Sequence, residues 1–132
     1  MTTSDLPAGG QPDVSAEGAE APFDDVITLS TSTDEDGVVT VTVVGEVDTF
    51  TAPVLRSTLD SQLEQQPREL VIDLSGVQFL GSAGLAVLVE TQKSSRSRDV
   101  ELRLIASTRA VTRPLEVTGL IDLFTIADST AR

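Results

Sequence analysis

The sequence predicts a single α/β domain built around a mixed sheet of about five strands that opens with a β-hairpin. Short β-branched or apolar runs alternate with segments of helical periodicity, in the order strand, strand, helix, strand, helix, strand, helix, strand. The first two runs are separated by an Asp-Gly turn signal, which favours a hairpin. The length of 132 residues and the apolar fraction of 39% suit one hydrophobic core.

The opening hairpin is expected from two β-branched runs. These runs are Val26 to Thr31 and Val38 to Val44, and the second alternates Val with Thr at a period of two. Between them lies the segment Asp34-Glu35-Asp36-Gly37, whose last two residues are typical of hairpin turns.

The first helix is expected after a loop from Gly45 to Thr51. Thr51 can cap this helix, and Pro53 falls in its first turn, where a missing N–H group costs nothing. Apolar residues one turn apart predict the face that packs on the sheet: Leu55, Leu59 and Leu63.

Leu70 to Leu74 is a nearly continuous apolar run, as expected for a strand buried on both faces of a mainly parallel sheet. Asp73 within this run needs hydrogen-bond partners, and we expect it to bind amides near Ser75. A loop from Ser75 to Gly84 and a second helix that follows Ser82 are expected next.

The last third of the chain predicts two more strands and a short helix. Val100 to Ala106 alternates apolar and charged residues, which indicates a strand with one solvated face. Arg109 to Thr118 is expected to be a helix that ends at Gly119, with Pro114 in its first turns. Leu123 to Ile126 is expected to be the final short strand.

Composition excludes several classes of function. Without Cys or His, the chain has no thiol catalysis, His-based triad, His general base or soft metal site. A formal net charge of −12 argues against nucleic acid and anionic membranes, which require a basic surface. The longest apolar run, Ala83 to Val89, is far shorter than the roughly 18 residues of a membrane span. The first ten residues lack the basic and apolar regions of a signal peptide, so we expect a cytoplasmic protein.

The acidic residues are concentrated at the start of the chain. Residues 1–55 hold 11 acidic residues and no basic one, whereas residues 56–132 hold 10 acidic and 9 basic residues. Residues 1–22 are also rich in Gly, Ala, Ser and Pro and show no apolar periodicity. Such a segment cannot bury enough apolar surface to offset the entropy of ordering it, so we expect 1–22 to be a disordered acidic tail and 23–132 to be the domain.

Three stretches resemble the motifs of one family. Gly45 to Leu59 (GEVDTFTAPVLRSTL) resembles the G-E-h-D…A-P-x-L-R…L stretch of STAS domains, where h is an apolar residue. Val71 to Leu88 (VIDLSGVQFLGSAGLAVL) resembles their h-h-D-h-S-x-h-x-F-h-D-S-S/A-G-L-x-x-L stretch, and Val111 to Ile126 resembles the end of the same domain. The resemblance covers about Val26 to Ile126 and is closest to the single-domain anti-sigma-factor antagonists of bacteria, of the SpoIIAA and RsbV type.

The resemblance implies a regulatory function. Such proteins bind an anti-sigma factor and release its sigma factor, and they are switched off when the anti-sigma factor, a serine kinase that uses ATP, phosphorylates one serine. That serine matches Ser82. The resemblance also implies that the two loops contact the partner through six residues: Asp48, Thr49, Gly81, Ser82, Ala83 and Gly84. We expect a monomer that needs no cofactor or metal and binds neither nucleic acid nor membrane.

The chain departs from the family at two places. Gly81 stands where the family usually has Asp directly before the serine, which bears on how efficiently Ser82 is phosphorylated. Family members also commonly continue into a final helix, while this sequence has six residues after Ile126, so we expect that helix to be short.

Simpler roles for the same residues are also open. Ser82 can be an N-cap, Asp48 can be a turn residue or complement a helix dipole, and Gly81 and Gly84 can permit tight turns and close packing. As a surface residue, Asp48 should change stability by less than about 1 kcal/mol on replacement by Ala. The alternative function is a constitutive STAS scaffold or transporter-associated subunit without a phospho-switch. An enzyme is not expected, because the chain has no Walker A motif and no acid–base pair at a suggestive spacing.

Overall fold

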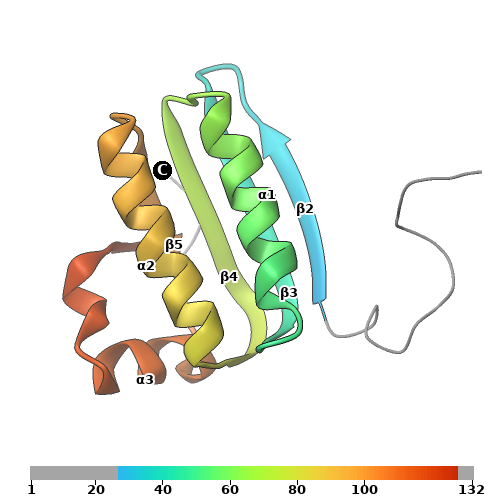
Figure 1. Ribbon diagram of the computed structural model, residues 1–132, viewed down its shortest axis with the longest axis vertical. Coiled ribbons are helices and arrows are strands. Elements are labelled where there is room, and N and C mark those ends of the chain that lie inside the picture. The colour runs from blue at the N-terminus through green and yellow to red at the C-terminus, as the bar shows by residue number, and fades with distance from the viewer. Residues whose placement is uncertain (1–26, 128–132) are drawn as a thin grey trace, which may run out of the picture.

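A computed structural model describes residues 27–127 of the chain (Figure 1). The predicted tail 1–22 and the predicted short final helix lie outside the described residues. The elements follow in the predicted order, with one short 3-10 helix (η2) added: β2 (Ile27–Thr33), β3 (Val38–Val47), α1 (Ala52–Glu64), β4 (Glu69–Leu80), α2 (Ser82–Ser97), β5 (Glu101–Ile105), α3 (Arg109–Val117), η2 (Leu120–Leu123) and β6 (Thr125–Ala127).

The described strands form one five-stranded mixed sheet. Its order is β2-β3-β4-β5-β6. Strand β2 pairs antiparallel with β3, and each following pair is parallel. The predicted fold class, a mixed sheet that opens with a hairpin, is therefore confirmed.

The hairpin turn is held by the side chain that the sequence places at its start. The Asp34 carboxylate accepts hydrogen bonds from the backbone N–H groups of Asp36, at 2.8 Å, and of Val38, at 3.0 Å. Gly37 adopts φ +83°, a conformation that glycine reaches without a steric penalty. The Asp-Gly signal therefore correctly predicted where the chain reverses.

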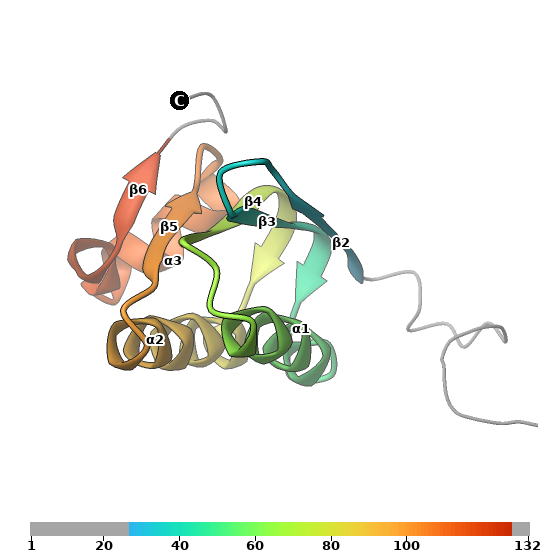
Figure 2. The ribbon, with the colours of Figure 1, turned by 90° about the horizontal axis from the view of Figure 1, so that it is seen from above.

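The main core lies between one face of the sheet and the helices α1 and α2, which run side by side (Figure 2). The predicted leucine stripe of α1 is fully buried there. Helix α3 contributes Val111 and Leu115 to the same core. Among the described residues, the other face of the sheet carries only a small buried apolar cluster: Val38, Val71 and Ile105.

Strand β4 is longer than the sequence predicted. The expected loop from Ser75 to Gly84 is strand as far as Leu80, and Gly81 alone separates β4 from α2. The pairing of β3 with β4 shifts register twice, after Thr42 and after Gly45, so β4 is bulged. These irregularities made the segment look like a loop in the sequence.

Asp73 stabilises the first of these irregularities. Its carboxylate oxygen Oδ1 accepts hydrogen bonds from the Ser75 backbone N–H, at 3.0 Å, and from the Ser75 hydroxyl, at 2.6 Å. This confirms the expected structural role of Asp73. A Cβ on Gly76 would stand 2.9 Å from a methyl carbon of Val44, so the bulge also requires the absence of a side chain there.

The end of the described chain differs in detail from the prediction. Helix α3 includes Pro114 and is stopped by Gly119, which adopts φ +77°. The segment expected to begin a strand at Leu123 is still in η2, and β6 starts at Thr125. The difference arises because four residues of 3-10 helix leave no clear sequence period.

Candidate functional site

The two segments that the sequence singled out reach the same edge of the sheet, at the carboxyl ends of β3 and β4. Val47 pairs with Leu80 at the end of these strands. The Gly81 N–H then donates a hydrogen bond to the Val47 carbonyl at 2.9 Å. Asp48 and Ser82, the next residues of each segment, therefore leave neighbouring strands side by side. Helices α1 and α2 both begin at this edge (Figure 1).

Ser82 is the first residue of α2 and is exposed. The interpretation of Ser82 as an N-cap is wrong, because the N-cap position belongs to Gly81. Within residues 27–127, the Ser82 hydroxyl has no hydrogen-bond partner. A free hydroxyl at the positive end of a helix dipole is accessible for modification, and a phosphate there would be favoured electrostatically.

The two glycines of this motif have different physical roles. A Cβ on Gly84 would stand 2.6 Å from Val47 Cγ1 and 2.7 Å from Leu80 Cδ1, so Gly84 allows α2 to approach the sheet. This is the close packing that the sequence suggested. Gly81, by contrast, has an ordinary extended backbone, with φ −91° and ψ −179°. No tight turn requires a glycine there, and the nearest neighbour of a Cβ would be the edge of the exposed Phe79 ring, at 3.1 Å, followed by the Val47 carbonyl oxygen at an ordinary 3.6 Å.

Asp48 organises the loop before α1. Its Oδ1 accepts hydrogen bonds from the backbone N–H groups of Phe50, at 2.9 Å, and Thr51, at 3.0 Å, and from the Thr51 hydroxyl, at 3.2 Å. The expected capping of α1 by the Thr51 side chain is wrong. The Thr51 hydroxyl instead donates to the Glu46 carbonyl and accepts from the Asp48 N–H, both at 2.9 Å. Asp48 is therefore a structural residue of this loop, and the small stability effect expected for its removal needs revision.

A groove of about 240 Å³ runs between the first turns of α1 and α2, and Ala83, the residue after Ser82, is part of its lining. Its α2 wall is made of small side chains, and Thr49 of the preceding loop lies at its α1 side. Near the groove, Arg56 of α1 forms an ion pair with Glu90 of α2. The residues that line the groove are Thr49, Ala52, Pro53, Arg56, Ala83, Ala86 and Val87.

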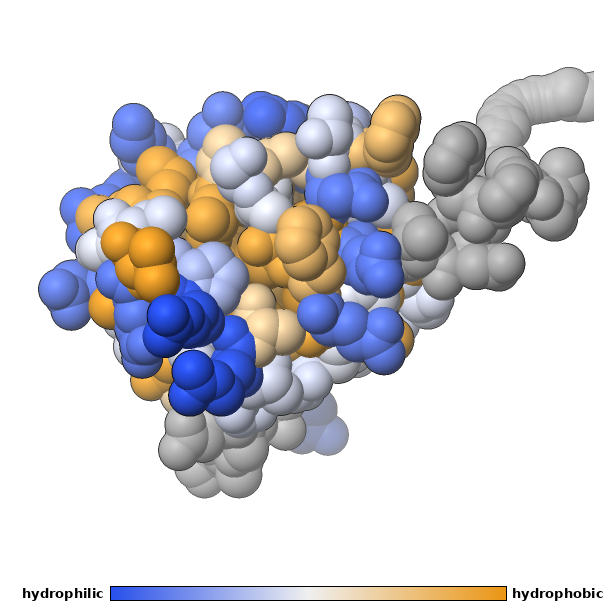
Figure 3. Space-filling view, turned by 90° about the horizontal axis from the view of Figure 1, so that it is seen from below, coloured by the Kyte–Doolittle hydropathy of each residue, from blue (hydrophilic) through white to orange (hydrophobic). Residues whose placement is uncertain are grey.

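Large apolar side chains are exposed in the segments that form this edge. Phe50 is 71% exposed, and Val54 and Phe79 are each 51% exposed. Figure 3, which looks onto the edge, shows hydrophobic side chains gathered in its middle with hydrophilic ones around them. Apolar surface of this kind marks interaction sites in soluble proteins. These residues were not predicted from the sequence. A large apolar residue in a loop, as Phe50 is in Asp48-Thr49-Phe50-Thr51, is a signal that would have indicated one of them.

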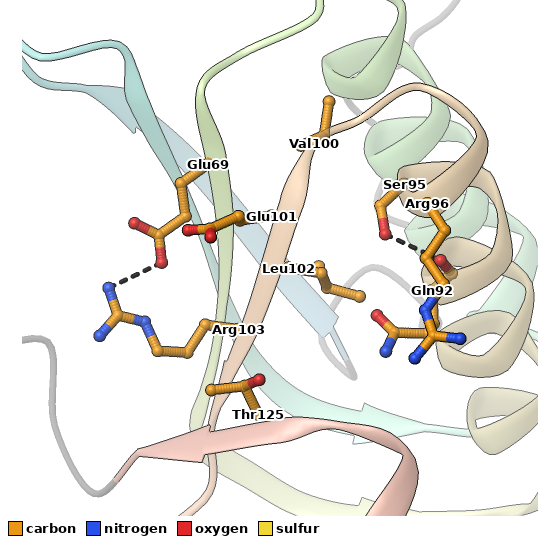
Figure 4. A pocket seen from close by; sticks show the side chains of 9 residues that line it. All are labelled: Glu69, Gln92, Ser95, Arg96, Val100, Glu101, Leu102, Arg103 and Thr125. Atoms are coloured by element: carbon orange, nitrogen blue, oxygen red, sulfur yellow. Dashed lines mark hydrogen bonds and ion pairs between the residues drawn. The ribbon is translucent and has the colours of Figure 1, made fainter.

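A second hollow, of about 520 Å³, lies far from Ser82, at the amino end of β5 (Figure 4). Glu69 and Arg103 form an ion pair across β4 and β5 there, at 2.7 Å, with both side chains largely buried. Gln92 of α2 donates a hydrogen bond to the Leu123 carbonyl, at 2.6 Å, on the other side of β5. These contacts hold the strands and α2 together, and none of them involves the residues predicted to bind a partner.

The comparisons with known proteins identify the family. The chain belongs to the STAS domain family, whose sequence profile it matches over residues 30–132. It is 35% identical over 100 residues to the anti-sigma-F factor antagonist RsfB of Mycobacterium tuberculosis, covering 76% of this chain and 80% of that protein. It is 31% identical over 99 residues to the anti-sigma-B factor antagonist of Staphylococcus aureus, covering 75% of this chain and 92% of that protein.

A solved structure gives the same result for the fold. The crystal structure of an anti-sigma factor antagonist from Mycobacterium paratuberculosis superposes with a TM-score of 0.72 at 36% identity, covering 85% of this chain and 92% of that one. The predicted resemblance to STAS-domain anti-sigma factor antagonists is thus confirmed. None of the helices in residues 27–127 is long and apolar enough to span a membrane.

Proposed function

We propose that this chain is an anti-sigma factor antagonist that binds an anti-sigma factor through the edge around Ser82 and thereby releases a sigma factor. Phosphorylation of Ser82 by the anti-sigma factor, acting as an ATP-dependent serine kinase, switches it off. The chain acts in the cytoplasm as a monomer and is not itself an enzyme, so the nucleotide belongs to the partner.

One observation carries this proposal. Ser82 presents a hydroxyl without a hydrogen-bond partner in the described structure, on an exposed helix start. Exposed apolar side chains belong to the segments that meet at the same edge, with Phe50 and Phe79 the largest. Aromatic side chains of this kind typically dominate the binding energy of an interface. The hydroxyl that would be modified therefore belongs to the proposed binding surface. A switch by phosphorylation requires this arrangement.

The switch works by direct interference at the interface. A phosphate at the start of α2 stabilises the helix, so unfolding is not the route to inactivation. It adds a charge of about −1.5 to −2 to the surface. In the centre of an interface, a desolvated and poorly paired charge costs about 2–5 kcal/mol. Such a cost weakens affinity by roughly 30-fold to several-thousand-fold.

The test uses the full chain with kinase-type anti-sigma factors and Mg-ATP. Intact mass spectrometry should show one added phosphate on the wild-type protein and none on Ser82→Ala. Titration calorimetry should show normal binding by Ser82→Ala and at least 30-fold weaker binding by Ser82→Glu, with the fold of both retained. Normal binding by Ser82→Glu, together with no phosphate on the wild-type protein, would overturn the proposal.

The apolar part of the surface is tested with a matched control. Phe50→Ala and Phe79→Ala should each weaken binding by about tenfold or more, as expected for aromatic anchors. Val117→Ala on α3 removes an apolar side chain as exposed as that of Phe50, 71%, and should leave binding unchanged. Equal losses in all three variants would show that binding does not depend on this edge.

A constitutive scaffold is the second candidate function, and Gly81 is the observation that favours it. The chain lacks the carboxylate that family members usually have next to the phosphorylated serine. Gly81→Asp should fit with only a small shift of the Phe79 ring, since the nearest contact of a new Cβ is 3.1 Å. If Gly81→Asp is phosphorylated by the same kinase while the wild-type chain is not, the scaffold function replaces the switch.

A further inference from the structure

Arg56 is held in the described structure by an interaction that is easily exchanged. Its guanidinium pairs with the carboxylate of Glu90, and the two side chains are 48% and 52% exposed. Ion pairs at this exposure contribute little net stability, because water and salt screen them. Arg56 can therefore leave Glu90 for a stronger anion at small cost.

Ser82 and Glu90 lie on the same exposed side of α2. Ser82, Ala86 and Glu90 recur at four-residue spacing, and all three are exposed. The rise of an α-helix separates Ser82 from Glu90 by about 12 Å along the axis. Ala86 lies halfway between them and is too small to block passage from one to the other.

Arg56 stands beside this stretch of α2, in the wall of the groove between the helices. The groove is lined by Arg56 together with Ala83, Ala86 and Val87 of α2. To reach Glu90, the side chain extends one turn past Ala86 along two helices that run in the same direction (Figure 1). Long helical side chains usually lean toward the helix N-terminus, which is here the direction of Ser82. A change of rotamer therefore brings the guanidinium toward Ser82.

Arg56 is also the sole basic residue in this part of the chain. The loop before α1, α1 itself and α2 as far as Gln92 contain no other Lys or Arg. The acidic residues of the same segments are Asp48, Asp60, Glu64 and Glu90. A phosphate on Ser82 would carry about −1.5 to −2 charges and three acceptor oxygens. Guanidinium groups bind phosphate and carboxylate in the same bidentate manner, and the larger charge of the phosphate gives it the stronger attraction at equal distance.

We propose that Arg56 is the intramolecular binding residue for the phosphate on Ser82, exchanging Glu90 for it when the serine is modified. The exchange lays Arg56 across Ala83 and Ala86 and so covers the groove that is open in the unmodified protein. Phosphorylation then closes a groove that would accept partner side chains, in addition to placing charge on the surface. This inference rests on the proposed phosphorylation of Ser82, and it deepens that function by naming how the modified state is held.

The test installs phosphoserine at position 82 of the full chain by genetic encoding, so no kinase is needed. Phosphorus NMR then measures the pH midpoint of the phosphate in three backgrounds. Arg56→Gln and Glu90→Gln both abolish the ion pair of the unmodified protein, but only Arg56→Gln removes the guanidinium. Glu90→Gln is therefore the matched control. A guanidinium near the phosphate favours its dianion. Arg56→Gln should therefore raise the midpoint by about 0.3–0.7 unit, and Glu90→Gln should lower it or leave it unchanged.

Two results would overturn the inference. One is a midpoint that does not change in Arg56→Gln. The other is a midpoint raised by Arg109→Gln or Arg113→Gln of α3 instead, which would assign the phosphate to those side chains. Neither result bears on the kinase assay of the proposed function, and a chain that no kinase modifies still gives a readable titration. Thermal melts of the unmodified variants check that the fold is retained.

Discussion

Asp48 shows how one carboxylate can fix the shape of a loop at the edge of a sheet. Its Oδ1 oxygen accepts three hydrogen bonds and so holds the turn that contains Thr49 and Phe50. The same residue stands beside the Val47 carbonyl that receives the Gly81 N–H. The loop before α1 and the start of α2 are thus locked to each other by backbone contacts, with Asp48 at their junction.

Replacement of Asp48 by Ala should lower the free energy of unfolding by about 1–2 kcal/mol, because two backbone N–H groups lose a charged acceptor. Urea denaturation measures this, with Asp60→Ala on the surface of α1 as the acidic control, expected within about 0.5 kcal/mol of wild type. Asp48→Asn keeps an acceptor oxygen without the charge. If partner binding weakens in Asp48→Asn as well, the charge itself contacts the partner. A change of less than 0.5 kcal/mol in Asp48→Ala would contradict the structural role described above.

At this site the sequence predicted the positions of some residues but not their contacts in space. The positions of Asp48 after a strand and of Ser82 at a helix start followed from local pattern, because strand ends and helix starts have short-range signals. The exposure of Phe79 and the pairing of Arg56 with Glu90 did not, since both depend on how α1, α2 and β4 meet in space. The predicted N-cap of α2 was also wrong by one residue, a typical error at helix ends.

At the level of elements, the bulged end of β4 determines where α2 begins. Turn chemistry and periodicity predicted the order of strands and helices correctly, because these signals are local. They failed for the second half of β4, where Ser75-Gly76 is part of a strand that Asp73 holds in an irregular register. A polar residue followed by glycine is typical of a loop unless the neighbouring strand is known, so the extension of β4 beyond Leu74 could not be predicted from sequence.

Gly84→Ala tests how closely α2 must approach this part of the sheet. The added methyl group meets Val47 and Leu80 at 2.6 Å and 2.7 Å, both side chains of the packed core. The gain of helix propensity from Gly to Ala, about 1 kcal/mol, is therefore outweighed by overpacking, and we expect a net loss of about 1–3 kcal/mol. Gly81→Ala is the control, expected within about 0.5 kcal/mol of wild type, because the exposed Phe79 ring can move. Equal stability of both variants in urea denaturation would show that α2 tolerates displacement.

The whole chain has a strongly uneven charge that the fold does not explain. Residues 1–55 contain 11 acidic residues and no basic one, whereas the net charge of residues 56–132 is −1. The described domain has its own core, closed by α1 and α2 over the sheet. From its charge, we expect the acidic segment at the start of the chain to act on solubility and association rather than on folding.

Residues 1–22 contain four acidic residues, three prolines and no apolar periodicity, a composition that predicts disorder and no contribution to the core. A variant that begins at Phe23 should melt within about 1 °C of the full chain. The NMR spectrum of the full chain should lose only sharp, poorly dispersed amide signals on this deletion. For a domain of this size, a fall of several degrees corresponds to about 1 kcal/mol, and it would mean that the segment packs on the domain. The boundary of the folded unit would then lie before Phe23.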